Sequence, residues 1–300
     1  MLNRIFLPSR SFPRALFPIL LASVPSSSSI GQDQLGQSTS RPTKVVVNGV
    51  ELHYIERGQG EPVVLVHGAL DDYRAWDDQI SPFAEHFRVI AYSRRYNFPN
   101  KSAGNPVDHS AIVEADDLAA LLRELQIKRA HLIGHSYGAY TILILAIKHP
   151  ELVQSLTSAE PPVHRWVAEL PEGRAAFKQF MDFWNGVGDA FRQGDTTTAL
   201  RVTTSFVTKG QATYESLPTE QRKVMEENMA EWKALTTSRD AFPSLDRREV
   251  QRLRVPTLLL CGENTLTIHK LVNGELDHPA EGKQPCEASD DLPSYTRDVE

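Results

Sequence analysis

The sequence His131-Leu132-Ile133-Gly134-His135-Ser136-Tyr137-Gly138 decides the fold, because it joins the end of an apolar run to the start of a helical pattern. Its last five residues match Gly-x-Ser-x-Gly. A serine at a tight turn from strand to helix takes a strained backbone conformation, and the flanking glycines let the two elements pack without colliding Cβ atoms. The hydroxyl then lies at the helix N-terminus, where free N–H groups stabilise negative charge. The stretch predicts Ser136 as a nucleophile; the plainer interpretation is a turn serine without chemistry.

Short apolar runs alternate with helical patterns on both sides of this turn. The Asn48-Gly49 pair lies between β-rich flanks and predicts a hairpin. Strands are expected at 44–47, 50–55, 62–68, 88–92, 131–134, 152–158 and 255–261, with helices around Trp76–Phe83, Leu118–Leu125 and Tyr140–Lys148. Strands that alternate with helices form right-handed βαβ units. The chain is therefore expected to be an α/β protein with a mostly parallel twisted sheet flanked by helices.

Residues 161–250 break this alternation. They are helix-prone, rich in large apolar side chains and without an obvious buried strand. A crossover between parallel strands needs only about a dozen residues, so we interpret this stretch as a helical lid inserted into a core made of residues 41–160 and 251–275. Ordinary core helices would explain the same apolar residues. These are Trp166, Phe177, Phe180, Met181, Phe183, Trp184, Phe191, Phe206, Met225, Met229 and Trp232.

A second loop supplies another part of a candidate acyl-transfer site. His67-Gly68-Ala69 ends its own apolar strand. Acyl transfer needs two N–H donors aimed at the developing oxyanion, and we expect these to be the backbone N–H groups of Ala69 and of Tyr137, which follows the serine. We expect His67 to be a loop residue with a satisfied hydrogen bond, and His135 to point away from the place of a general base.

With these residues the sequence resembles the α/β-hydrolase superfamily, in its serine-nucleophile branch. The resemblance covers about residues 43–275. It rests on Asn48-Gly49, Val64–Gly68, Gly134–Gly138, Glu160-Pro161-Pro162 and Pro256–Glu263. Members with aspartate at the nucleophile position, such as epoxide hydrolases and haloalkane dehalogenases, use a carboxylate. With Ser136 the resemblance implies esterase, thioesterase, amidase or perhydrolase chemistry, and no metal or organic cofactor.

The superfamily also needs a carboxylate and then a histidine, in that chain order. Glu160, which follows the strand after the nucleophile helix, is our favoured acid, and Glu263 is the alternative. The histidine is expected on a loop after a final strand, but no apolar run follows Val272. His269, expected on an outer helix, and His278 are weak candidates for the base. We therefore expect the usual C-terminal strand and helix to be missing, as a frame shift or truncation from about Asp277 would produce.

The two ends of the chain have a composition unlike the middle. Residues 1–40 contain three arginines within the first fourteen positions, then an apolar run at Ala15–Ala22 and a serine tract. This order is typical of a secretory signal. A secreted or periplasmic protein is expected; an organellar or cytoplasmic one is the alternative. Residues 276–300 are acidic and poor in apolar side chains, which predicts a disordered tail. Cys261 and Cys286 are a weak basis for a disulfide.

Composition excludes several classes of protein. The 300 residues are 41% hydrophobic and carry a net charge of −6, which argues against a nucleic-acid partner. The chain lacks eighteen successive apolar residues, so a stable membrane span is not expected. The leading hypothesis is a serine hydrolase that acts on a small, largely apolar ester through an acyl-enzyme. The alternatives are an inactive hydrolase-like binding protein, a truncated product, and, within the family, a perhydrolase or cofactor-free oxygenase.

Overall fold

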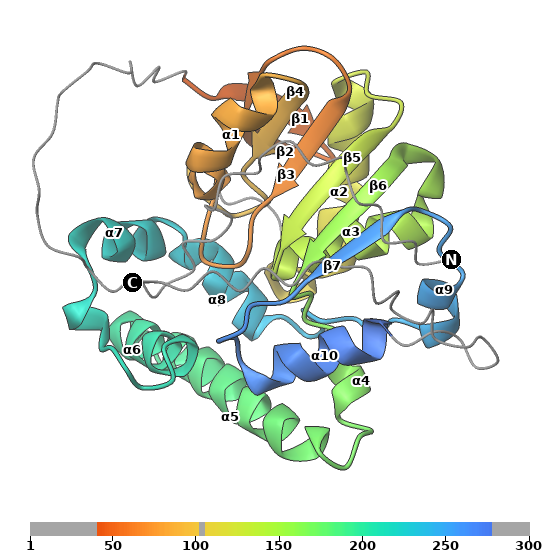
Figure 1. Ribbon diagram of the computed structural model, residues 1–300. Coiled ribbons are helices and arrows are strands. Elements are labelled where there is room, and N and C mark those ends of the chain that lie inside the picture. The colour runs from red at the N-terminus through yellow and green to blue at the C-terminus, as the bar shows by residue number, and fades with distance from the viewer. Residues whose placement is uncertain (1–40, 102–105, 278–300) are drawn as a thin grey trace, which may run out of the picture.

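A seven-stranded sheet forms the centre of the protein in the computed structural model, which describes residues 41–101 and 106–277 (Figure 1). The strands are β1 (Thr43–Val47), β2 (Val50–Arg57), β3 (Pro62–Val66), β4 (Arg88–Tyr92), β5 (Ala130–His135), β6 (Val153–Ala159) and β7 (Thr257–Leu260). Their order across the sheet is β1-β2-β4-β3-β5-β6-β7. The five strands from β4 to β7 run parallel, and β2 is antiparallel to both of its neighbours. The mostly parallel α/β sheet expected from the sequence is confirmed.

The β1–β2 hairpin turns at the Asn48-Gly49 pair. Both residues have positive φ, 47° and 76°, so the turn has the primed geometry that matches the twist of paired strands. Val47 pairs with Val50 directly beside the turn. This local signal was sufficient to predict the hairpin.

Strand β3 is buried on both faces because helices cover both sides of the sheet. Val63 and Leu65 pack in a cluster with Trp76 and Ile80, whereas Val64 and Val66 join the main core. Successive side chains of a strand point to opposite faces, so this strand contributes to two apolar layers. That explains why it reads in the sequence as a continuous apolar run rather than as an alternating one.

The helices of the core lie between the strands in sequence. They are α1 (Asp77–Ala84), α2 (Ala111–Glu124) and α3 (Tyr137–Lys148), with short 3₁₀ turns at Tyr73–Trp76, Pro106–Asp108 and Pro150–Leu152. Ser110 caps α2 by accepting a hydrogen bond from the Val113 N–H. After β7 the chain forms α10 (Thr267–Asp277), which confirms the helix expected at this place.

Only helices lie between β6 and β7 in the described chain. They are α4 (His164–Val167), α5 (Gly173–Arg192), α6 (Thr196–Val207), α7 (Thr219–Glu227), α8 (Met229–Thr237) and α9 (Arg247–Gln251), with a 3₁₀ turn at Tyr214–Ser216. Figure 1 shows α5 to α8 beyond the carboxyl ends of the parallel strands. The helical character of residues 161–250 is confirmed, while their role as a lid stays a prediction.

The large aromatic side chains of these helices pack mainly against one another. Phe183 stacks on Phe206 with ring centroids 4.0 Å apart, and Trp184 meets Trp232 edge to face at 5.2 Å. Phe180, Phe183, Trp184 and Trp232 are all buried and belong to the main core. These rings therefore stabilise the helical layer, and the apolar substrate inferred from them stays a prediction.

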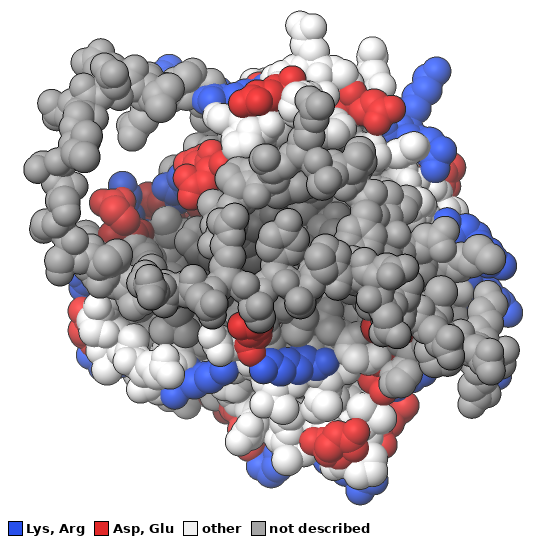
Figure 2. All heavy atoms as spheres, in the orientation of Figure 1, with Lys and Arg blue, Asp and Glu red and all other residues white. Residues whose placement is uncertain are grey.

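Several expectations fall on residues 1–40 and 278–300, which lie outside the described part of the chain. They include the signal segment, the disordered tail, His278 and Cys286. Among the described helices none is long and apolar enough to span a membrane. On the described part of the face in Figure 2, basic and acidic side chains are interspersed.

Candidate active site

Ser136 lies at the turn between β5 and α3, as the motif predicts. Its backbone has φ 50° and ψ −119°, a conformation that non-glycine residues rarely adopt. The Ser136 N–H donates to the Ala159 carbonyl at 2.8 Å, which holds the turn against the end of β6. A Cβ atom on Gly134 would come within 2.7 Å of the Ala139 nitrogen. The glycine thus permits the close packing of strand and helix that presents the serine.

The His67-Gly68-Ala69 loop lies directly beside this turn. A Cβ atom on Gly68 would meet the Ser136 Cβ at 3.3 Å. Among the described residues no acceptor is found for the backbone N–H groups of Ala69 and Tyr137. The loop and the N-terminus of α3 therefore approach each other at the serine, and the role of Ala69 and Tyr137 as oxyanion donors stays a prediction.

His67 is fully buried and uses both ring nitrogens in the loop. Its Nδ1 lies 2.8 Å from the Gly68 carbonyl, and its Nε2 lies 3.0 Å from the Arg94 N–H. These partners require a proton on Nδ1 and a free lone pair on Nε2. Burial, with the nearby Arg94 charge, lowers the pKa of His67 well below 6.5. The expectation that His67 is a hydrogen-bonded loop residue rather than a base agrees with this geometry.

Glu160 follows β6 and is 7% exposed, with a positive φ of 52°. Its carboxylate accepts hydrogen bonds from the Gly262 N–H and the Thr265 hydroxyl, both at 2.8 Å. It thereby joins the end of β6 to the loop after β7. Glu263, the alternative acid, is exposed in that loop. Of the two carboxylates, Glu160 is the one held in a defined position.

Three histidines lie close to Glu160 or to each other near this end of the sheet: His135, His164 and His269. His269 of α10 has its ring centroid 5.3 Å from that of His164 in α4. Burial lowers the pKa of His269 to about 4, against the opposing effect of the Glu160 charge. Burial likewise lowers the pKa of His135, and Glu160 again opposes the change. His269, expected on an outer helix, is therefore largely enclosed and lies within electrostatic reach of Glu160.

His164 allows the enclosure of this cluster to be tested by pH. Both of its ring nitrogens are buried and have no hydrogen-bond partner in the described part of the chain, and burial lowers its pKa well below 6.5. The unfolded chain therefore binds a proton below about pH 6.5 that the folded protein excludes, so folding loses stability as the pH falls. We expect the free energy of unfolding of His164→Leu, relative to wild type, to rise by about 1–2 kcal/mol between pH 7 and pH 5. Urea unfolding at both pH values measures this difference; a constant difference would show that His164 is accessible to protons.

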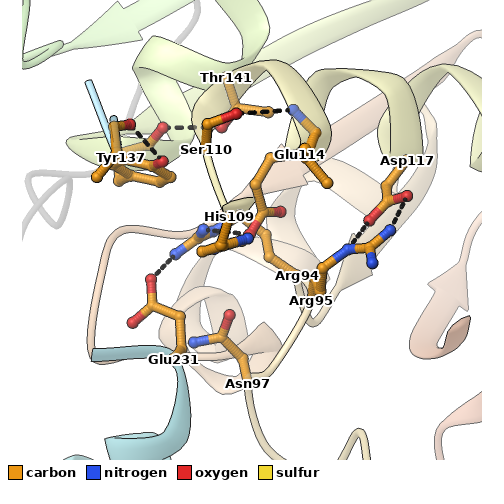
Figure 3. Close-up of polar contacts among 12 residues, drawn as sticks. Arg94, Arg95, Asn97, His109, Ser110, Glu114, Asp117, Tyr137, Thr141 and Glu231 are labelled. Carbon is orange, nitrogen blue, oxygen red and sulfur yellow. Dashed lines mark hydrogen bonds and ion pairs between the residues drawn. The ribbon is translucent and has the colours of Figure 1, made fainter. Parts of the chain in front are cut away.

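The structure adds two buried charges that the sequence did not single out. Arg94 follows β4 and Glu231 lies in α8; both side chains are fully buried and pair at 2.8 Å (Figure 3). Arg94 stands at the carboxyl end of a buried strand, a place where functional groups gather in parallel sheets. Glu231 shares a helical face with Trp232 and Leu235, and an acid on an apolar face was the available signal.

Comparison with known proteins agrees with this geometry. The sequence profile described as the alpha/beta hydrolase fold matches residues 61–288. The chain belongs to this family. The match includes the serine turn after β5 and the helices between β6 and β7.

Individual relatives match over shorter stretches. The hydrolase RutD of Pantoea ananatis is 36% identical over 101 residues, which are 34% of this chain and 36% of RutD. The bifunctional epoxide hydrolase 2 of Sus scrofa is 30% identical over 115 residues, or 38% of this chain and 21% of that protein. The chain thus matches about a third or less of each relative's length. An esterase structure from Thermogutta terrifontis has a TM-score of 0.59 at 20% identity, covering 80% of this chain and 88% of that one, and this likeness concerns the fold.

Proposed function

We propose that this protein is a serine hydrolase that cleaves a small, largely apolar ester or related acyl compound through an acyl-enzyme on Ser136. The observation that carries the proposal is the backbone of Ser136, whose φ of 50° is strained for any residue other than glycine. Such strain is retained where a site uses it. Here it supports a serine hydroxyl presented at the N-terminus of α3.

In the proposed reaction the Ser136 Oγ attacks the acyl carbonyl carbon and its proton passes to a base. The carbonyl oxygen becomes an oxyanion, which the Ala69 and Tyr137 N–H groups stabilise. The alcohol then leaves with a proton, and water attacks the ester formed on Ser136. The carboxylic acid departs and the serine hydroxyl is restored.

The remaining catalytic roles are assigned from the cluster beyond β6. Glu160 is the proposed acid of the triad, and His269 is the proposed base. Like His135 it interacts electrostatically with Glu160, and its pKa of about 4 keeps it neutral at pH 7. A neutral imidazole can accept the serine proton, although a base of such low pKa is weak. A low turnover rate is therefore part of the proposal.

Apolar surroundings of the His67-Gly68-Ala69 loop, here called the oxyanion loop, support the substrate class. Ala69 and Leu70 are partly buried against the main core. Leu70 also packs with Met229 against a second apolar cluster, which contains Leu200, Tyr214, Leu217 and Met225. An acyl chain that enters beside Ala69 would meet these side chains rather than charged ones.

Covalent labelling tests the proposal directly. A fluorophosphonate reacts with a serine only when its hydroxyl is activated and an oxyanion can be stabilised. We expect the full chain to be labelled at Ser136, as mass spectrometry of the peptide would show, and Ser136→Ala to stay unlabelled. A wild-type protein that remains unlabelled while a known serine esterase reacts under the same conditions would refute the proposed function.

A hydrolase-like binding protein without turnover is the second candidate. It is favoured by Glu160, whose two oxygens accept hydrogen bonds from Gly262 and Thr265. This arrangement would equally well fasten the loop after β7 without any catalysis. The absence of labelling, together with saturable binding of a carboxylate or ester to the folded protein, would favour this second candidate.

A further inference from the structure

Arg94 lies at the centre of a buried polar network that includes Glu114 and Glu231 (Figure 3). Its Nη1 donates to Glu114 of α2 at 3.0 Å and its Nη2 to Glu231 of α8 at 2.8 Å. All three side chains are fully buried. Although burial alone would lower the pKa of Arg94, the charges of Glu114 and Glu231 raise it, so the guanidinium stays protonated.

The same guanidinium also fixes the backbone of the loop. Arg94 Nε donates to the His67 carbonyl at 3.1 Å, and Nη2 donates to the Gly68 carbonyl at 2.9 Å. The His67 ring donates to the same Gly68 carbonyl. The carbonyl of Gly68 and the N–H of Ala69 belong to one trans peptide group, so they point in opposite directions. Holding the Gly68 carbonyl toward Arg94 therefore turns the Ala69 N–H away from Arg94 and outward.

Glu231 holds the next residue of the loop. Its Oε1 accepts from Arg94 while its Oε2 accepts the Leu70 N–H at 3.0 Å. Leu70 has a φ of 57°, a left-handed conformation that a bulky side chain rarely adopts and that surrounding contacts must maintain. Glu231 lies in α8, and it is 161 residues beyond Leu70 in the sequence. One carboxylate of the helical insertion thus contacts both the loop and the arginine behind it.

Arg94 also contacts the residue that carries the second donor. Its guanidinium carbon lies 5.1 Å from the centre of the Tyr137 ring. The Tyr137 hydroxyl in turn donates to the Ala241 carbonyl, in the segment between α8 and α9, at 2.7 Å. The groups around both proposed oxyanion donors are therefore tied to the inserted helices.

We propose that Arg94 and Glu231 are positioning residues for the oxyanion site: the ion pair between them orients the Ala69 N–H toward Ser136 only while α8 is docked. This inference rests on the proposed function, because it assigns a catalytic purpose to the N–H it orients. The inserted helices then act on the reaction through the geometry of the loop. If α8 moved away, Glu231 could no longer accept the Leu70 N–H, and the Ala69 N–H would lose its orientation.

Glu231→Gln is the decisive variant, because one amide cannot replace both carboxylate oxygens. Whichever way the amide turns, its NH₂ group faces either Arg94 or the Leu70 N–H, and a donor then meets a donor. Glu114→Gln is the matched control. It removes an equally buried charge from the same arginine, but Glu114 has no bond to residues 67–70. In the part of the chain that the structure describes, its Oε2 has no partner that the amide NH₂ would displace. The two variants therefore separate loop positioning from loss of buried charge.

The test combines ester kinetics with hydrogen exchange of the peptide that contains residues 67–72. For Glu231→Gln we expect kcat to fall about 10- to 100-fold, because small misplacements of a catalytic group cost this much, with KM changed by less than about twofold. Amide exchange in residues 67–72 should rise at least about tenfold. Glu114→Gln should keep kcat within about threefold and leave exchange in this peptide unchanged. Equal effects of the two variants on kcat and on exchange would overturn the inference.

The exchange measurement also separates this inference from the proposed function. If the wild-type protein shows neither ester hydrolysis nor fluorophosphonate labelling, the proposed function fails. Exchange then decides the inference: faster exchange of residues 67–72 in Glu231→Gln alone supports the hold of α8 on the loop. Unchanged exchange in that variant refutes it.

Discussion

Ser136→Ala is expected to lower kcat/KM for p-nitrophenyl esters by at least about 100-fold. The loss stays below the roughly 10⁴- to 10⁶-fold lost from an efficient triad, because the proposed base is weak. Alanine removes only the hydroxyl, and the strained backbone of residue 136 must still be accommodated. What remains after the substitution is catalysis by the oxyanion donors alone. Steady-state rates at several ester concentrations measure the effect. Wild type and Ser136→Ala are compared at equal protein concentration, without prior exposure to fluorophosphonate.

The neighbouring strand offers a control for this substitution. Ser158 of β6 is fully buried, and its hydroxyl has no hydrogen-bond partner among the described residues. Ser158→Ala removes a hydroxyl from the strand that pairs with Gly134 and leaves the backbone bond between Ser136 and Ala159 in place, so we expect its kcat/KM to match that of wild type. Equal rates for Ser136→Ala and wild type would instead assign any hydrolysis to another group and reject the acyl-enzyme.

The sequence was informative wherever the signal is local. The Asn48-Gly49 turn and the apolar runs of β3 and β4 are set by neighbouring residues, because burial on both faces demands unbroken apolar side chains. Ser136 and its glycines were predictable for the same reason, since the steric demands of the turn lie within five residues. Strand β4 was predicted at Arg88–Tyr92, the residues that form it.

The buried charges could not be found in this way. Arg94 and Glu231 are 137 residues apart, and each is an ordinary charged residue in its own segment. A lone buried charge is costly, so each is stable only through partners that the fold supplies. The spatial order of the strands, with β4 between β2 and β3, is likewise a long-range property.

The aromatic residues of the insertion illustrate a different limit of sequence reasoning. Large apolar side chains line ligand sites and fill cores alike, so composition does not separate the two roles. Phe183 and Trp184 are buried against other rings of the same helices. The proposed apolar substrate therefore rests on Ala69 and Leu70, which pack against the main core and follow Gly68, the residue that approaches Ser136 in the folded chain.

The second large effect is expected from Gly138, where α3 crosses the end of β3. A Cβ atom on Gly138 would lie 2.3 Å from the Val66 carbonyl oxygen and 2.4 Å from that of His67. Both obstacles are backbone atoms, so α3 or the His67-Gly68-Ala69 loop must move. We expect Gly138→Ala to lower the free energy of unfolding by at least about 3 kcal/mol, measured by urea unfolding at pH 7. Because the His67 carbonyl is displaced, labelling of Ser136 in the remaining folded protein should slow as well.

Gly186 in α5 provides the matched control. There the same Gly-to-Ala change is made in a helix, and no described atom beyond the adjoining residues and the backbone of that helix lies within 4 Å of the added Cβ. There alanine restricts the unfolded chain and favours the helix, so Gly186→Ala should raise the free energy of unfolding by up to about 1 kcal/mol. The opposite signs isolate the contact with Val66 and His67 from the general preference of helices for alanine. A Gly138→Ala protein as stable as wild type would mean that α3 does not approach β3 this closely, and the strained presentation of Ser136 would then lose its steric cause.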